Sequence, residues 1–161
     1  MTGVSDDLRD LYQEVILEHA RSPRNRRALD PATPGVHKAE GFNRLCGDRL
    51  NVYLHLQDGV VQDVCFEGSG CAISTASASL MTQSVKGHTE AEIEAMFRAF
   101  HALVTEGRDA AAAASDAVLG KLEVFAGVRE FPARVKCASL AWHTMHAALK
   151  ANGNAVVSTE D

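Results

Sequence analysis

The sequence predicts an α+β fold in which a small antiparallel sheet is covered by helices. Apolar residues occupy every second position from Leu50 to Leu56, which is typical of a half-buried strand. The dipeptide Asp58-Gly59 follows directly and suits a two-residue hairpin turn, so Val60–Phe66 can return as the paired strand. Helical patterns precede this hairpin once and follow it several times, an order that indicates α+β rather than alternating βαβ units.

One helix and one further strand are expected before the hairpin. Apolar residues recur at helical spacing from Ser5 to Ala20, and the Ser5 hydroxyl can cap this helix. The segment Arg21–Gly35 contains three prolines and four arginines, which predicts an irregular, solvated connection. We expect an additional strand at Val36–Asn43.

Two helices are predicted directly after the hairpin. Cys71–Val85 is rich in Ala, Ser and Met and carries few charges, so it should be a buried helix. Thr89–Val104 should form a second, amphipathic helix, because Thr89 and Glu92 have the spacing of a capping box.

The remaining chain predicts a linker, two helices and a tail. Gly107–Ser115 resembles a linker with a short alanine run. A short helix is expected at Asp116–Gly127. Pro132 interrupts the pattern, so the last long helix is expected at Cys137–Ala151. We therefore predict a single domain over residues 1–151 and a disordered tail over 152–161.

Composition excludes several classes of function. The chain has 161 residues, 46% of them hydrophobic, which suits one globular domain. Its net charge of −5 makes nucleic acid an unexpected partner. No stretch approaches the roughly 18 apolar residues of a membrane span, and Met1–Asp10 lacks the features of a signal peptide. We expect no membrane association and a cytoplasmic location.

Four cysteines in a reducing compartment are expected to be ligands, nucleophiles or buried apolar residues rather than disulfide partners. None belongs to a CxxC pair, so any shared site must be assembled by folding. Cys46, Cys71 and Cys137 lie at the ends of predicted elements, where side chains commonly reach one cleft. Cys65 lies inside a predicted strand and is expected to be a small buried residue.

The surroundings of the other three cysteines favour metal binding or nucleophilic chemistry. Cys71 and Cys137 are predicted to open helices, where the positive end of the helix dipole favours a thiolate. In Cys46-Gly47-Asp48 the thiol and the carboxylate are two residues apart and can project to the same side of an extended chain. From spacing alone, burial as ordinary apolar residues remains an equal alternative for each cysteine.

Three cysteine motifs, in this order, resemble the IscU/NifU-N-terminal family of iron–sulfur assembly proteins, and most closely its SufU branch. The motifs are Leu45-Cys46-Gly47-Asp48, Phe66-Glu67-Gly68-Ser69-Gly70-Cys71-Ala72-Ile73-Ser74 and Arg134-Val135-Lys136-Cys137-Ala138. The resemblance also includes Leu11–Leu17 followed by Pro23-Arg24-Asn25, and so covers roughly residues 8–150. The resemblance implies a small antiparallel sheet covered by helices and a metal site made by Cys46, Asp48, Cys71 and Cys137.

For the SufU branch, the resemblance implies Zn²⁺ as the cofactor and a SufS-type, pyridoxal-phosphate-dependent cysteine desulfurase as the partner. The implied activity is a sulfurtransferase that accepts persulfide sulfur for iron–sulfur cluster assembly. Three thiolates and one carboxylate are suitable ligands for tetrahedral Zn²⁺. We expect Cys46 to accept the sulfur, because its glycine-flanked segment should move more easily than a helix start. Asp48 should make the site exchangeable.

Two alternatives remain: a scaffold on which a [2Fe–2S] or [4Fe–4S] cluster is built, with other iron–sulfur assembly proteins as partners, and a binding module with a structural zinc. Scaffold members of the family carry a histidine immediately before the third cysteine, where this sequence has Lys136. Gly107–Phe131 also resembles the insertion of the SufU branch. Both departures favour the sulfur carrier.

Other polar residues have a less specific interpretation. Arg134 lies three residues before Cys137 and can support a thiolate electrostatically. His143 and His146 have a spacing that metal sites use, but a packed or exposed helical face is the expected explanation. The arginines between positions 21 and 27 are expected to be solvated, with contact to an acidic partner as the alternative.

Overall fold

The computed structural model describes residues 6–115, 117–150 and 154–158 and contains one sheet and six helices. The N-terminal helix is α1 (Asp6–Arg21), and the strands are β1 (Val36–Asn43), β2 (Asp48–Gln57), β3 (Val60–Ser69) and β4 (Asn154–Ser158). The other helices are α2 (Ala72–Val85), α3 (Glu90–Thr105), α4 (Arg108–Ala114), the 3₁₀ helix η1 (Gly120–Glu130) and α5 (Pro132–Lys150).

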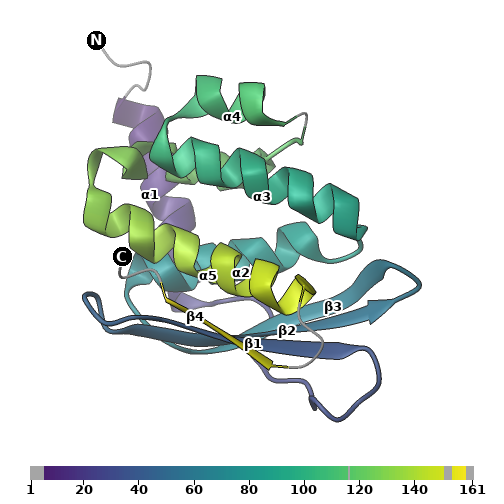
Figure 1. The fold of residues 1–161 in the computed structure, drawn as a ribbon. Coiled ribbons are helices and arrows are strands. Elements are labelled where there is room, and N and C mark those ends of the chain that lie inside the picture. The colour runs from purple at the N-terminus through teal and green to yellow at the C-terminus, as the bar shows by residue number, and fades with distance from the viewer. Residues whose placement is uncertain (1–5, 116, 151–153, 159–161) are drawn as a thin grey trace.

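The sheet has the strand order β3-β2-β1-β4. β1, β2 and β3 are antiparallel neighbours, as predicted, and β1 has the expected bounds. Asp58 and Gly59 both have positive φ angles, of 55° and 77°, which confirms the two-residue turn between β2 and β3. The α+β prediction is therefore confirmed, and the helices cover one face of the sheet (Figure 1).

The fourth strand differs from the prediction for the tail. Residues 154–158 form β4, which pairs in parallel with β1 so that Glu40 lies opposite Val156. The main chain of β4 supplies this pairing, and the Val156 side chain is 66% exposed. The prediction of a disordered tail is wrong for these residues, and residues 152–153 and 159–161 lie outside the described part of the chain.

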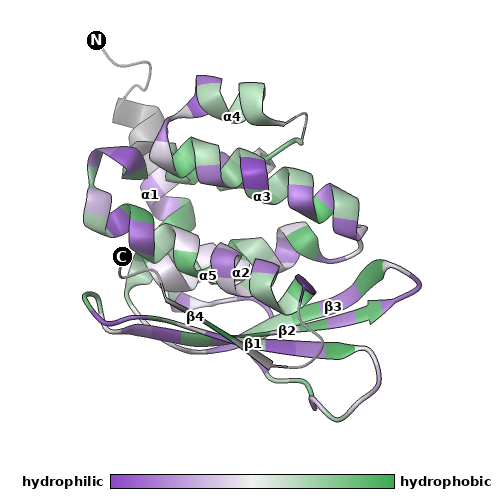
Figure 2. Ribbon diagram, viewed as in Figure 1, coloured by the Kyte–Doolittle hydropathy of each residue, from purple (hydrophilic) through white to green (hydrophobic). Residues whose placement is uncertain are grey.

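The helices are stacked on the sheet in two layers. α2 and α5 pack directly on the strands, and α3 packs against α5 and η1 (Figure 1). Along the strands and α3, hydrophobic and hydrophilic positions alternate in the pattern that buries one side of each element (Figure 2). The centre contains large side chains with no exposed surface, among them Phe100, Phe125 and Leu54. None of the described helices is long and apolar enough to cross a membrane.

The predicted buried helix is α2, and the predicted capping box is present at the start of α3. The Thr89 side chain accepts a hydrogen bond from the Glu92 N–H, and the Glu92 side chain accepts one from the Thr89 N–H. Differences appear later in the chain. The alanine run forms a short helix, α4, instead of a linker, and the next helix is the 3₁₀ helix η1. Asp116 lies outside the described residues.

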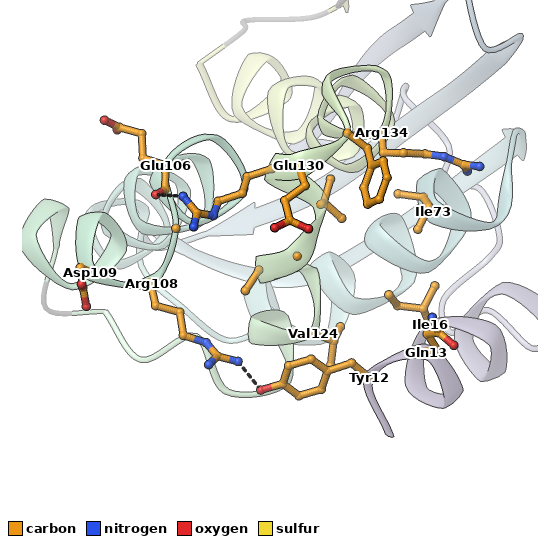
Figure 3. Close-up of a pocket in the computed structure, with 16 residues that line it drawn as sticks. Tyr12, Gln13, Ile16, Ile73, Glu106, Arg108, Asp109, Val124, Glu130 and Arg134 are labelled. Carbon is orange, nitrogen blue, oxygen red and sulfur yellow. Dashed lines mark hydrogen bonds between the residues drawn. The ribbon is translucent and has the colours of Figure 1, made fainter. Parts of the chain in front are cut away.

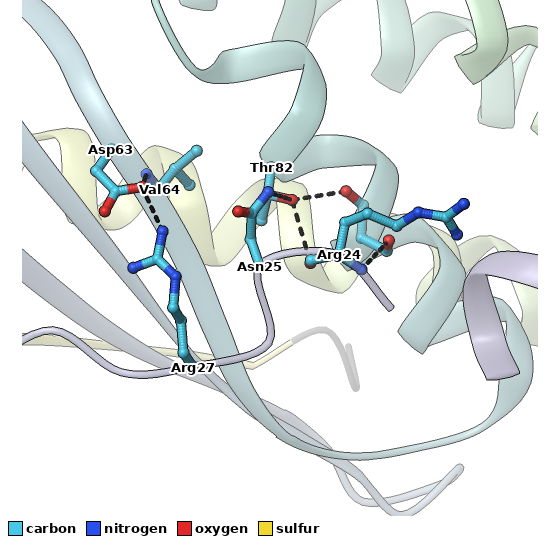
Figure 4. A network of polar contacts seen from close by, with 7 residues as sticks. Arg24, Asn25, Arg27, Asp63, Val64 and Thr82 are labelled. Atoms are coloured by element: carbon cyan, nitrogen blue, oxygen red, sulfur yellow. Dashed lines mark hydrogen bonds and ion pairs between the residues drawn. The ribbon is translucent and has the colours of Figure 1, made fainter. Parts of the chain in front are cut away.

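The connection after α1 is irregular, as predicted, but polar contacts fix its path (Figure 4). The Asn25 side-chain amide donates to the Thr82 hydroxyl of α2 at 3.0 Å. Arg27 is exposed, yet it pairs with Asp63 of β3 at 2.6 Å. Arg24 pairs with Glu18 of α1. These arginines are therefore used within the chain as well as being solvated.

Candidate metal centre

Cys46 lies in the tight turn between β1 and β2. The buried Asn43 side chain accepts a hydrogen bond from the Leu45 N–H at 3.1 Å, which fixes the turn. Gly47 has a φ of +72°, a conformation that favours glycine. Cys46 is half-buried, and it is carried by a loop rather than by a helix.

Asp48 is the first residue of β2, and its side chain is only 1% exposed. One carboxylate oxygen accepts a hydrogen bond from the Cys71 N–H at 2.8 Å. The close approach requires Gly70, because a Cβ atom there would lie 2.7 Å from Asp48 Oδ1. The turn before α2 is therefore shaped around this carboxylate.

Cys71 is the N-cap residue of α2, as the sequence predicts. Its Sγ accepts a hydrogen bond from the Ser74 N–H at 3.4 Å. A hydrogen bond from Cys137 and the backbone N–H groups of the first helical turn lower the pKa of Cys71 to about 6, although burial opposes them. Cys71 is therefore the cysteine of this site for which the structure favours the thiolate.

Cys137 does not open its helix, so this prediction is wrong. α5 begins at Pro132, which places Cys137 in the second turn with 1% of its surface exposed. Hydrogen bonding to Cys71 and burial raise the pKa of the Cys137 thiol, in the direction opposite to that expected at a helix start. Its Sγ donates to Cys46 Sγ at 3.0 Å.

Folding brings all four predicted ligands together; we call Cys46, Asp48, Cys71 and Cys137 the cysteine cluster. The ligand atoms of Cys46, Asp48 and Cys137 all lie within 4.8 Å of one another. Cys71 joins them through Asp48, with 3.9 Å between Cys71 Sγ and Asp48 Oδ2. Tetrahedral zinc–sulfur bonds of about 2.3 Å place sulfur ligands about 3.8 Å apart. The donor types of the four residues therefore fit Zn²⁺, with Cys46, Asp48 and Cys137 already at ligand spacing and Cys71 adjoining them at Asp48.

Cys65 does not belong to the cysteine cluster. It is fully buried on β3, in register with Tyr53 of β2. Burial raises the pKa of Cys65 to about 11. The expectation of a small buried residue is confirmed, and the thiol is protonated at neutral pH.

The remaining candidates lie outside this centre. Arg134 is exposed, and Figure 3 shows its side chain beside Ile73 at the edge of a large cavity; its support of a thiolate stays a prediction. His146 contacts Glu94 at 2.9 Å and stacks on Phe97, while His143 meets the edge of the same ring. These histidines form a packed helical face, as expected.

The sequence analysis missed the residues that shape the site without being ligands. Asn43 precedes Cys46 by three positions, and an asparagine before a tight turn is the local signal that predicts its role. Gly70 lies in the motif that contains Cys71, but its contact with Asp48 depends on the fold and leaves no local signal.

Comparison with known proteins agrees with the fold and the site. Residues 11–138 match the model of the NifU-like N-terminal domain. The chain is 37% identical over 140 residues to the zinc-dependent sulfurtransferase SufU of Bacillus subtilis (strain 168), covering 86% of this chain and 89% of that protein. It is 36% identical over 148 residues to the iron–sulfur cluster assembly scaffold protein IscU of Streptococcus pyogenes serotype M1, covering 92% and 88%.

A solved structure gives the same result. FiSufU from Fervidobacterium islandicum AW-1, described as an iron–sulfur cluster assembly scaffold protein for the SUF system, superimposes with a TM-score of 0.69 at 26% identity, covering 85% of this chain and 95% of that one. Fold, cysteine motifs and relatives agree, so the chain belongs to the NifU-like N-terminal domain family, which includes the IscU and SufU proteins of iron–sulfur cluster assembly.

Proposed function

We propose that this protein is a zinc-dependent sulfurtransferase that accepts persulfide sulfur from a SufS-type, pyridoxal-phosphate-dependent cysteine desulfurase. The observation that carries the proposal is that the three thiols of the cysteine cluster lie on different kinds of element, two on helices and one on a turn. Cys71 caps α2 and Cys137 lies within α5, whereas Cys46 lies on the turn between β1 and β2. A cluster built in this way can present one sulfur while two keep their places.

Cys46, Asp48, Cys71 and Cys137 would hold the zinc ion. When bound, Zn²⁺ keeps thiolates deprotonated near neutral pH and has no redox chemistry of its own. The backbone N–H of Cys71 orients the Asp48 carboxylate, and the Ser74 N–H supports negative charge on Cys71. The Asn43 side-chain amide donates to Cys46 Sγ at 3.9 Å, which favours negative charge on the Cys46 sulfur.

The transfer itself is a thiol–persulfide exchange. The Cys46 thiolate attacks the outer, sulfane sulfur of the persulfide on the desulfurase cysteine. A new S–S bond forms on Cys46, the S–S bond of the donor breaks, and the donor cysteine leaves as a thiolate. No external oxidant or reductant is needed. A reducing compartment such as the cytoplasm, where we place this step, keeps the four thiols free for it.

A cluster scaffold is the second candidate, because a relative of similar identity is named as the scaffold protein IscU. Lys136 favours the sulfurtransferase, because the scaffold members that this family resemblance includes carry a histidine at the position of Lys136. Metal analysis and a visible absorption spectrum of protein purified without added iron separate the two functions. Colourless protein with one zinc ion per chain is expected, and a chromophore containing iron and sulfide would support the scaffold.

The direct test mixes the protein with a desulfurase and cysteine, alkylates the products and maps the additional sulfur by mass spectrometry. We expect persulfide on Cys46 and none in the Cys46→Ser variant, which should also lose stimulation of the desulfurase. Cys65→Ser is the matched control and should behave like the unaltered protein. Persulfide mainly on Cys65 or Cys137 would contradict the proposal. Zinc binding without any sulfur acceptance would indicate a binding module with a structural metal.

A further inference from the structure

A large cavity lies next to the cysteine cluster. It encloses about 1030 Å³ between α1, the segment 106–109, η1 and the first turn of α5, and we call it the η1 groove. In Figure 3 the Tyr12 ring and Arg108 lie at one end of the groove, and the Glu130 carboxylate points into it. The volume is at the upper end of the roughly 300–1,000 Å³ of ordinary ligand pockets, so it has room for several side chains of a peptide.

The other end of the η1 groove reaches the cysteine cluster. Ile73, which lines the groove, lies two residues after Cys71 on α2. Arg134, also in the lining, lies one helical turn before Cys137 on α5. The β1–β2 turn that carries Cys46 lies at this same end of the molecule, as Figure 1 shows. A molecule bound at Cys46 therefore meets the mouth of the groove.

Two large apolar side chains are exposed where the groove meets the cluster. Leu45, next to Cys46, is 75% exposed, and Phe131 of the groove wall is 60% exposed. Ala133, two residues after Phe131, has its carbonyl oxygen 4.0 Å from Cys46 Sγ, so the chain segments that carry Leu45 and Phe131 meet at this sulfur. Charged residues of both signs, including Glu130 and Arg134, border this apolar surface. An apolar centre with a polar rim is the usual anatomy of a protein interface.

The chemistry of the sulfur donor identifies the occupant. A persulfide is covalently attached to a cysteine of the donor, so the donor's own surface must reach Cys46. A standard protein interface covers about 800 Å² on each partner. Such an interface centred on Cys46 extends over Leu45, Phe131 and the mouth of the groove. The mixed charges of the lining suit a peptide segment better than a small anion.

We propose that the η1 groove receives a segment of the cysteine desulfurase that flanks its persulfide-bearing loop, with Phe131 and Leu45 as apolar anchors. This inference rests on the proposed function. The groove determines how tightly the donor binds, while the cysteine cluster carries out the transfer.

The test fills the groove without touching the cluster. A Cβ atom at Gly127, which lines the groove, meets no atom within 4 Å, so Gly127→Phe adds a ring to open space. Val118→Phe is the matched control, because Val118 is 90% exposed and lies outside the lining of the groove. Phe131→Ser removes an anchor whose side chain is mostly in solvent. Zinc content and thermal unfolding of every variant show whether fold and metal centre are intact.

Desulfurase turnover is measured against the concentration of each variant. Gly127→Phe and Phe131→Ser should raise the half-saturating concentration at least tenfold and leave maximal turnover and zinc content within twofold. Val118→Phe should match the unaltered protein. Normal half-saturation by both groove variants would refute the docking proposal alone. No stimulation and no sulfur on Cys46 in the unaltered protein would remove the proposed function as well.

Two other occupants give different results. A change in the cysteine concentration needed for turnover, with unchanged half-saturation by the protein, would show that the groove binds a small molecule. Self-association of the unaltered protein that Gly127→Phe abolishes would show that it binds a second copy of the chain. Either result overturns the proposal.

Discussion

Asp48 has two separable tasks, and replacing it by alanine or by asparagine should separate them. Its carboxylate accepts the Cys71 N–H at 2.8 Å and also belongs to the cysteine cluster. Alanine removes both the acceptor and the metal ligand. Asparagine retains an oxygen that can accept from Cys71 but loses the negative charge. The two variants should therefore differ in the stability of the metal-free protein and agree in poor zinc binding.

The size of each effect follows from the contacts. An N–H group left without an acceptor costs about 1–3 kcal/mol, and the lower half of that range applies because Cys71 is only half-buried. For a chain of this length, a loss of about 1–2 kcal/mol lowers the unfolding temperature by about 2–8 °C. In the metal-free protein, Asp48→Ala should lower the unfolding temperature by this amount, and Asp48→Asn should lower it only slightly. Loss of a charged ligand should weaken zinc binding by at least about tenfold in both.

Thermal unfolding after chelation, followed by titration with zinc, measures both quantities on the same samples. Asp63→Asn is the control, since Asp63 pairs with Arg27 on β3 and lies outside the cysteine cluster. The interpretation fails if Asp48→Asn binds zinc as tightly as the unaltered protein. Full desulfurase stimulation by Asp48→Ala would remove this carboxylate from the transfer mechanism.

Three further measurements address the cluster and the fold. Cys65→Ser should leave one zinc ion per chain and Cys71→Ser should lose it; the reverse result would show that the ligand assignment is wrong. Removing zinc from the unaltered protein should lower the free energy of unfolding by about several kcal/mol, because the ion joins distant segments. An unchanged unfolding temperature after chelation would contradict this. Burial lowers the pKa of His19, whose ring contacts the Ser79 hydroxyl at 2.7 Å, below the 6.5 expected in the unfolded chain. The unfolded chain therefore takes up the proton first, so this stability is present above about pH 6.5 and is lost as pH falls. His19→Gln should make unfolding less sensitive to pH between 7.5 and 5.5, and an unchanged slope would refute this role.

Local signals in the sequence were sufficient for much of the fold. Alternating apolar residues predict β2, and Asp58-Gly59 predicts the turn into β3, because both signals act between neighbouring residues. The capping box at Thr89 and Glu92 marks the start of α3 for the same reason. β4 escaped prediction because it depends on main-chain pairing with β1, more than a hundred residues earlier in the chain.

The site was less accessible to the same reasoning. Element ends suggested where each cysteine would lie, but no local signal brings Cys46, Cys71 and Cys137 together. The family resemblance supplied the set of four candidates, and the fold supplies their spacing. The hydrogen bond from Cys71 N–H to Asp48 crosses 23 residues, so it could not be derived from either motif alone.

The start of α5 shows how one misplaced boundary changes the predicted chemistry. Pro132 is favoured in the first turn of a helix, where its missing N–H has no partner to lose, so it begins α5 instead of interrupting the chain before it. Cys137 consequently lies one turn deeper, where burial and hydrogen bonding to Cys71 raise the pKa of its thiol in the metal-free protein. The helix start that favours a thiolate is used once, at Cys71. Cys71 and Cys137 are thus held by helices, whereas Cys46 lies on a turn and accepts a hydrogen bond from the Asn43 side-chain amide. Cys46 therefore combines a hydrogen-bond donor with a less rigid position, the two properties that the proposed acceptor needs.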